Sequence, residues 1–235
     1  MTRHEFPKLI NEPPQVKGER KGGAVNLALL GQIAEAGRML NEGVGIGGIE
    51  WAARRAFGIP RGYLEQADAI GIENIVAALE FLSDGTNPGD AVFAVYHNFF
   101  APPQSFLDRA RSKGPQARPE PFVADPSKLD EPEDVLLMGL LRKRFQAVAF
   151  MTAAEVAEAG LLELADADAA FTSALGWREG PFAMMNRMGL EDSLRLVTER
   201  MELSHRNEIN FPVPRLLIDQ VGRRQPWPLS PSRED

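Results

Sequence analysis

Histidine is the side chain best suited to acid–base or metal chemistry in this sequence, which has three: His4, His97 and His205. They lie in separate segments, with neither the helical i, i+4 spacing nor the short spacings of metal ligands. His97 stands in an aromatic-rich run, where a shifted imidazole could act as a general base, although a hydrogen-bonded core histidine explains the run more simply. The chain has no cysteine, which excludes thiolate nucleophiles and cysteine-ligated metals. We therefore expect no metal site, and these residues identify no catalytic group.

A glycine-rich segment at residues 43–48 satisfies the dinucleotide-binding pattern G-x-G-x-x-G. That pattern binds a cofactor where the glycines follow a strand and open a helix whose amides face the pyrophosphate. Here they follow a long helical pattern, so we interpret them as a helix-to-helix connection. We expect the chain alone to bind no cofactor.

Charged side chains along the same helical patterns have a simpler explanation than chemistry. Glu35 and Glu42 belong to a helix with one polar face, and we expect solvent to satisfy them. Arg142, Lys143 and Arg144 could form a phosphate-binding patch, but a solvated helix face is the interpretation we favour.

The elements that must position these residues are helices, because apolar residues recur at spacings of three and four along most of the chain. The run at residues 91–100 fits a strand or a buried helix, and its helical surroundings favour a helix. The ranges expected to be helical are a first helix from residue 24 to a stop at Gly43, then 49–57, 64–70, 75–82, 104–112, 133–160, 166–175 and 190–203, and a closing helix near residue 215.

A turn with two glycines four residues apart occurs twice. The glycines at 58, 62 and 71 recur at 176, 180 and 189, a constant offset of 118, and the segments 100–108 and 211–219 correspond at an offset of 111. Glycine is favoured where φ is positive or backbones approach closely, so each copy predicts helix, tight turn, helix. Two unrelated helical hairpins are the alternative, but the spacing favours an internal repeat.

The repeat and the composition suggest a domain organisation. We expect an extended arm at 1–22, a first helical domain at 23–114, a linker at 115–132, a second helical domain at 133–222 and an irregular tail at 223–235. A net charge of −7 over 235 residues argues against nucleic acid or an anionic membrane as partner. No apolar run approaches the length of a signal peptide or membrane span, so we expect a cytoplasmic protein.

Two sets of segments in this sequence match the pattern of a known domain. In the first half they are Gly23-Ala24-Val25-Asn26, Glu35-Ala36, Glu42-Gly43, Ile49-Glu50, Phe57-Gly58-Ile59-Pro60, Gly62, and Ala67-Asp68 with Gly71. In the second half they are Leu175-Gly176-Trp177, Gly180-Pro181-Phe182 and Gly189-Leu190. Each half resembles the C-terminal helical domain of the 3-hydroxyacyl-CoA dehydrogenase family, as in the tandem copies that close multifunctional fatty-acid oxidation enzymes.

The resemblance implies an all-α fold of two tandem helical-bundle repeats, acyl-CoA substrates and a role in fatty-acid β-oxidation. In the family, an NAD-binding Rossmann domain supplies the catalytic His–Glu dyad, and an asparagine at the start of the first helix reaches the substrate. Only Asn26 carries over, as a substrate-binding residue. NAD is then expected only through a Rossmann partner, and the chain itself as a monomer or homodimer.

Two functions follow from the resemblance. The chain could be the acyl-CoA-binding part of a split dehydrogenase, inactive alone. It could instead be a non-catalytic dimerisation or assembly module, which two departures from the family pattern favour: Leu27 replaces the usual arginine and Tyr63 the usual proline. An independent dehydrogenase is the third and least favoured hypothesis.

Overall fold

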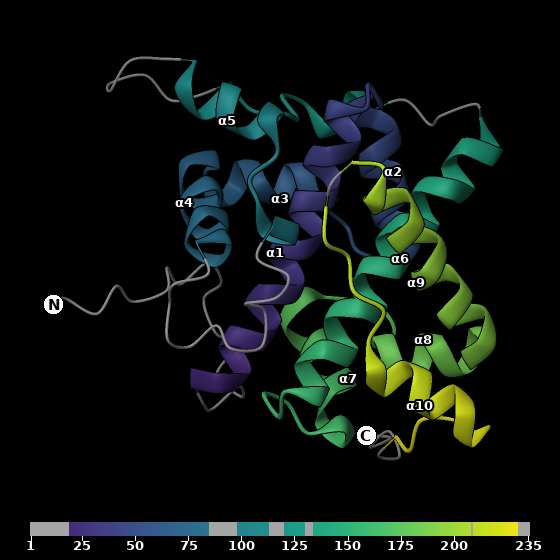
Figure 1. Ribbon diagram of the computed structural model, residues 1–235. Coiled ribbons are helices and arrows are strands. Elements are labelled where there is room, and N and C mark those ends of the chain that lie inside the picture. Colours follow the sequence, from purple (N-terminus) through teal and green to yellow (C-terminus); the bar gives the residue numbers. More distant parts are fainter. Residues whose placement is uncertain (1–18, 85–97, 113–119, 130–133, 208, 230–235) are drawn as a thin grey trace, which may run out of the picture.

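The computed structural model describes residues 19–84, 98–112, 120–129, 134–207 and 209–229, and every regular element within these ranges is helical (Figure 1). The predicted all-helical fold is therefore confirmed. The α-helices are α1 (Glu19–Asn41), α2 (Ile46–Phe57), α3 (Tyr63–Ile70), α4 (Ile72–Ser83), α5 (Gln104–Arg111), α6 (Val135–Glu158), α7 (Leu164–Leu175), α8 (Pro181–Met188), α9 (Leu190–His205) and α10 (Arg215–Arg223).

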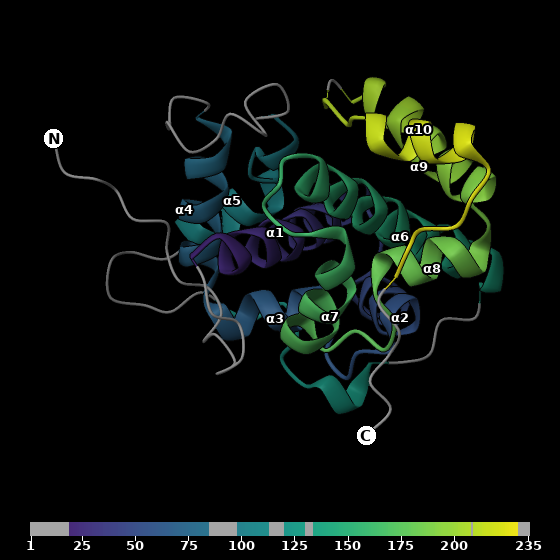
Figure 2. The same cartoon turned by 90° about the horizontal axis from the view of Figure 1, so that it is seen from below.

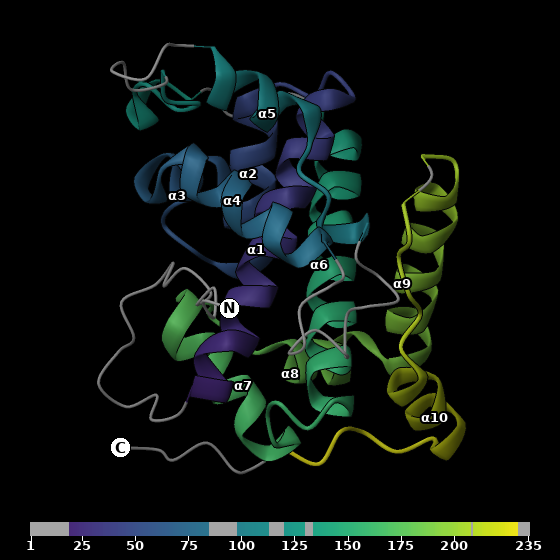
Figure 3. The same ribbon diagram turned by 60° about the vertical axis from the view of Figure 1, so that its left-hand side comes forward.

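Two long helices, α1 and α6, lie side by side at the centre of the molecule, with the shorter helices around them (Figures 1 and 2). They run in opposite directions, because Gln32 of α1 donates to the Phe145 carbonyl, whereas Gly31, nearer the start of α1, lies against Thr152, further along α6. Helices α2 to α5 pack on one side of this pair, and α9 and α10 lie on the other (Figure 3). The central pair thus positions every other helix.

One hydrophobic core extends through both halves of the chain. The ring centroids of Tyr63 and Phe145 are 5.3 Å apart, and Phe57 stacks on Trp177 with centroids 4.2 Å apart. Such offset and stacked pairs stabilise beyond the area they bury. The two predicted domains therefore share a core, and their division into separate units stays a prediction.

Two predicted boundaries differ from the structure. Helix α1 begins at Glu19, so residues 19–22 belong to it and not to the expected arm, whose remaining residues 1–18 lie outside the described ranges. Part of the expected linker is packed against the first half: the Asp68 carboxylate accepts the amides of Phe122 (2.7 Å) and Val123 (2.8 Å). The Phe122 side chain is also buried, against Phe106. A proline-rich composition alone did not reveal these contacts.

Three further expectations concern the C-terminal tail, the run at residues 91–100 and membrane-spanning helices. The tail is irregular from Gln225 to Leu229, although Trp227 is buried against the Phe182 ring. Of the run at 91–100, only residues 98–100 are described, and they form a single 3₁₀ turn. None of the described helices has the length and apolar character needed to cross a membrane.

Candidate functional site

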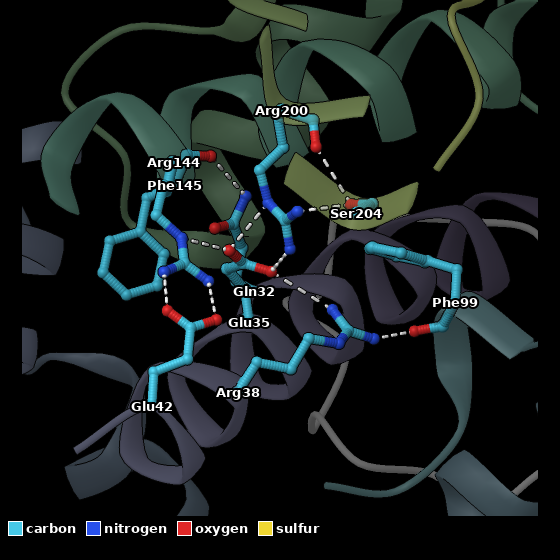
Figure 4. Close-up of polar contacts among 9 residues, drawn as sticks. All are labelled: Gln32, Glu35, Arg38, Glu42, Phe99, Arg144, Phe145, Arg200 and Ser204. Atoms are coloured by element: carbon cyan, nitrogen blue, oxygen red, sulfur yellow. Dashed lines mark hydrogen bonds and ion pairs between the residues drawn. The ribbon is translucent and has the colours of Figure 1, made fainter. Parts of the chain in front are cut away.

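Glu35 is fully buried on α1 and lies among three arginine side chains (Figure 4). Arg144 on α6 donates from Nε to its Oε1 (2.8 Å), and Arg38, one turn along α1, donates from Nη1 to Oε2 (3.2 Å). Arg200 on α9 donates to both oxygens, from Nε (2.9 Å) and Nη2 (2.6 Å). One carboxylate therefore joins three helices that are far apart in the sequence.

The charges in this cluster stabilise one another. Burial alone would raise the pKa of Glu35, but the guanidinium groups of Arg200, Arg144 and Arg38 hold it well below its usual range. Burial lowers the pKa of Arg38 to about 10 despite the opposing charge of Glu35. Burial would also lower the pKa of Arg144, but Glu35 and Glu42 raise it above its usual value. The carboxylate is thus ionised across the neutral range.

Each arginine has a further acceptor, so the cluster is closed by its own hydrogen bonds (Figure 4). The additional pairs are Arg144 with both oxygens of Glu42, Arg200 with the Ser204 hydroxyl, and Arg38 with the Phe99 carbonyl. A carboxylate held ionised by so many donors is a weak base, and its donors have little capacity left for a ligand. We conclude that the cluster holds α1, α6 and α9 together and does no proton chemistry.

The cluster corrects two sequence-based expectations. Glu35 was expected on a solvated face, and it is fully buried, because Arg200, 165 positions later in the chain, supplies a compensating charge. Arg144 was expected to be solvated with its two neighbours. Arg142 and Lys143 are indeed exposed, but Arg144 turns inward, with only 12% of its side chain exposed. Glu42 keeps 35% of its side chain exposed and is ion-paired.

Asn26, the predicted substrate-binding residue, lies apart from this cluster. It precedes Glu35 by nine residues on α1, which places it about 14 Å along the axis and on the opposite side of the helix. The residue is only 9% exposed, its neighbours Val25 and Leu27 are buried, and its side chain makes no hydrogen bond with the described residues.

The two glycine turns have matching backbone geometry. Gly58 ends α2 at φ 70° and ψ 24°, and Gly176 ends α7 at φ 68° and ψ 21°, in the left-handed region that favours glycine. Gly71 and Gly189 likewise agree, with φ of 97° and 96°. The conformations expected from the spacing are therefore present in both turns.

An acidic side chain closes each turn in the same way. Glu50 accepts the amide of Leu64 (2.8 Å) at the start of α3. Asp168, 118 residues after Glu50, accepts the amides of Phe182 (2.9 Å) and Ala183 (2.8 Å) at the start of α8. A Cβ on Gly62 would lie 2.5 Å from the Glu50 carboxylate, and one on Gly180 2.2 Å from Asp168. The second glycine of each turn is thus required for close approach and not for positive φ.

The two turns also contact each other. The Arg178 amide donates to the Phe57 carbonyl (2.8 Å), and a Cβ on Gly58 would lie 3.0 Å from the Arg178 side chain. The residue that corresponds to Arg178 in the first turn is Pro60, which has no N–H to donate. The first turn therefore cannot donate the equivalent hydrogen bond back to the second turn.

Three polar atoms are buried close to this contact without a well-formed hydrogen bond to the described residues: Glu50 Oε2, Tyr63 Oη and Trp177 Nε1. The indole of Trp177 is nevertheless near enough to Tyr63 to oppose the rise in the pKa of its hydroxyl. Burial raises the pKa of Glu50 to about 7, against the opposing Leu64 amide and Arg54. Burial also raises the pKa of the Tyr63 hydroxyl, and the negative charge of Glu50 raises it further. A carboxyl group in this environment favours its protonated form.

The remaining candidates supply no chemistry among the described residues. His4 and His97 lie outside the described ranges, and His205 is exposed at the end of α9. No group of three or more histidine or carboxylate side chains in the described part could hold a metal ion. The segment at 43–48 does not fit a dinucleotide, because the amides of Gly43 and Val44 bond to the carbonyls of Leu40 and Met39 in α1. Residues 43–45 form the predicted helix-to-helix connection, whereas residues 46–48 are already the first turn of α2.

Comparison with known proteins finds a likeness to one family. The described part of the molecule is all helical and organised around a central antiparallel pair and two glycine turns. Residues 139–222 match the family model of the 3-hydroxyacyl-CoA dehydrogenase, C-terminal domain. No curated protein and no solved structure matches the chain. The resemblance recognised from the residues is confirmed over residues 139–222, whereas a second copy of the domain before residue 139 stays a prediction.

Sequence reasoning missed Glu50, Arg38 and Arg200. For Glu50 a signal was present: Glu50 precedes Gly62 by twelve residues, and Asp168 precedes Gly180 by the same distance. For Arg38 the i, i+3 spacing from Glu35 on α1 was a local signal. For Arg200 no local signal exists, because its partner is fixed only by how α1 and α9 pack.

Proposed function

We propose that this chain is the acyl-CoA-binding part of a split 3-hydroxyacyl-CoA dehydrogenase of fatty-acid β-oxidation, and that it acts with an NAD-binding Rossmann partner. The observation that carries the proposal is the nearly buried amide of Asn26, which has no hydrogen-bond partner among the described residues, on a chain whose residues 139–222 match the C-terminal domain of that enzyme family. Because cysteine is absent, we also infer a reducing, cytoplasmic location.

Asn26 has the chemistry for orienting an acyl-CoA. Its side chain offers two N–H donors and a carbonyl acceptor, so it can bond to the thioester carbonyl or to the 3-oxygen. A polar group that lacks a partner in an apolar setting gains more from a new hydrogen bond than one exposed to water. In this proposal Asn26 holds the substrate, the partner supplies the general base, and NAD bound by the partner accepts the hydride.

The test combines this chain with the nearest separately encoded Rossmann-type dehydrogenase and follows NADH loss that depends on acetoacetyl-CoA. We expect turnover above that of the partner alone, and little turnover by this chain alone. Asn26→Ala should lose at least about ten-fold in kcat/KM, the equivalent of one good hydrogen bond to substrate. Asn207→Ala, at an exposed asparagine in the turn after α9, is the matched control and should leave the rate unchanged. No gain over the partner alone would overturn the proposal.

A specific observation favours the second candidate, a non-catalytic assembly module. Val135, Leu136 and Leu140 at the start of α6 are 78%, 83% and 59% exposed. Large apolar side chains exposed together mark interaction surfaces more often than isolated ones do. Titration of the chain with acyl-CoA in a calorimeter separates the candidates, because an assembly module should give no heat of binding.

A further inference from the structure

The contact between the two glycine turns shares a helix face with a carboxyl group that is fully buried. Glu50 and Phe57 lie seven residues apart on α2, so both belong to its buried face. Glu50 reaches the start of α3, where it accepts the Leu64 amide (2.8 Å). Phe57 reaches the second turn, where its carbonyl accepts the Arg178 amide (2.8 Å) and its ring stacks on Trp177. One face of α2 therefore carries both the carboxyl group and the contact between the two halves of the chain.

The charges around Glu50 suit a protonated carboxyl group better than a carboxylate. The charged side chains with the largest effect on it are Arg54, one turn along α2, and Glu65 on α3. Arg54 lies closer to Glu65 (2.9 Å) than to Glu50 (3.9 Å). The other cation beside Glu65 is the exposed Arg61 (3.5 Å). An ionised Glu50 would thus be a buried charge whose nearest cation is already paired, which is costly.

Two other helices, α1 and α6, also pack against α2. The charges of the ion cluster on these helices, Glu35 with Arg38 and Arg144, are bonded to one another. Next to this site α6 presents the uncharged ring of Phe145, which packs against Tyr63. These contacts offer Glu50 no second cation.

We propose that Glu50 is a pH-sensitive switch, and that loss of its proton loosens the contact of Phe57 with Trp177 and Arg178. Burial raises the pKa of Glu50 to about 7, so the contact should be tight below this pH and loose above it. The proton passes to water, so the step needs no other reactant. The inference goes beyond the proposed function, which requires no change in this contact with pH.

A movement of the Glu50 carboxylate reaches the contact through α3. The carboxylate lies against Gly62, where a Cβ would come within 2.5 Å of it, so a carboxylate that turns toward solvent displaces the start of α3. Tyr63 begins α3 and packs edge-on against Phe57, with ring centroids 5.9 Å apart. The Tyr63 hydroxyl is also close enough to the Trp177 indole for the indole to affect its pKa. Both rings of the contact therefore lie beside the residue that a charged Glu50 would displace.

The second turn provides an internal reference, because its acidic side chain is better satisfied as a carboxylate. Asp168 is only half-buried and accepts two amides, from Phe182 (2.9 Å) and Ala183 (2.8 Å). The one well-formed hydrogen bond of Glu50 comes from Leu64. Burial also raises the pKa of Asp168, but its two amides oppose the rise. We therefore expect the pH-dependent change at the first turn and not at the second.

Fluorine NMR of the whole chain labelled with fluorotryptophan, without acyl-CoA or partner, follows the contact. The chain has three tryptophans, and the resonance that remains in both Trp51→Phe and Trp227→Phe belongs to Trp177. We expect this resonance to shift with a midpoint at about pH 7. Glu50→Gln should abolish the shift, whereas Glu155→Gln, at a second buried glutamate whose pKa is raised to about 7, is the matched control and should keep it. A Trp177 resonance that stays constant, or that shifts equally in Glu50→Gln, would overturn the proposal and leave the proposed function standing.

Hydrogen exchange of the Arg178 amide tests the loosening itself. This amide donates to the Phe57 carbonyl, and its protection factor should fall at least about ten-fold between pH 5 and pH 8, the factor equivalent to one pKa unit. The Phe182 amide, which donates to Asp168 in the second turn, should keep its protection. Equal losses at both amides would show a global loss of stability and would overturn the switch.

A second variant moves the titration while Glu50 and its bond to Leu64 stay in place. Arg54→Gln removes the cation that favours the carboxylate, so it should move the midpoint of the Trp177 shift to higher pH by about one unit. A midpoint that stays or falls would show that another group titrates, and the proposal would be wrong.

Discussion

Replacing Glu50 by glutamine tests how burial of a carboxyl group shapes the stability of the first glycine turn. Glu50 is fully buried, and its pKa in the folded protein is about 7, compared with 4.5 for an ordinary glutamate. Because the folded pKa is raised, the stability from Glu50 is fully present below pH 4.5 and is lost as the pH rises through 7. A difference of this size lowers the free energy of unfolding by about 3 kcal/mol over that window.

Glutamine removes the titration and keeps the turn. Its carbonyl oxygen can still accept the Leu64 amide, as Glu50 Oε1 does at 2.8 Å, and it has no charge to bury. We expect Glu50→Gln to be about as stable as the wild type at pH 5 and more stable by about 2 to 3 kcal/mol at pH 8. Glu155 is also buried and also has its pKa raised to about 7, so both proteins should retain part of the pH dependence.

Urea unfolding at pH 5 and pH 8, extrapolated to water, measures both free energies. The quantity to compare is the difference between the two proteins at each pH, because the contribution of Glu155 then cancels. Glu80→Gln, at an exposed glutamate of α4, is the matched control and should shift stability by a similar small amount at both pH values. A Glu50→Gln protein that is less stable than the wild type at pH 8 would refute the reasoning. It would show that the ionised carboxylate stabilises the fold, through its ion pair with Arg54 at 3.9 Å.

Two further predictions concern the ion cluster and the glycine turn. Glu35→Gln should lower the free energy of unfolding in urea at pH 7 by about 3 to 5 kcal/mol, because it leaves the buried Arg200 without its counter-charge. A loss below about 1 kcal/mol would contradict the central role of the cluster. Gly62→Ala should cost about 1 to 3 kcal/mol, because its methyl group overlaps the Glu50 carboxylate, whereas Gly45→Ala, with open space around the new Cβ, should change stability little. Equal effects at Gly62 and Gly45 would mean that the carboxylate moves aside freely.

Most of the helices could be predicted from the sequence, because helix formation leaves a local pattern. Apolar residues at spacings of three and four placed α2 to α4, α6, α7 and α9 within a few residues of their observed ends, whereas no range was given for α8. The start of α1 was placed late, at residue 24 instead of Glu19. The residues before it lack apolar periodicity, which was the only signal used to place the boundary.

The candidate site was much less predictable. Asn26 came from a family pattern, and the structure adds that its amide is nearly buried and has no hydrogen-bond partner in the described part of the chain. The ion cluster could not be predicted, because Glu35 becomes a buried charge only when Arg144 and Arg200 reach it from positions 109 and 165 residues away. The contact of Phe122 with Asp68 was hidden for the same reason, inside a proline-rich stretch that indicates a linker.

The sequence by itself determined the helical class, the family resemblance and the two turns in which glycine is required, since all three depend on residue types and short spacings. Only the tertiary structure decided which charges are buried, which amides donate hydrogen bonds to the carboxylates of Glu50 and Asp168, and which apolar side chains of α6 remain exposed to solvent. Those outcomes depend on how helices distant in the sequence pack against one another. A buried charge is stable only when such packing brings its partner to it.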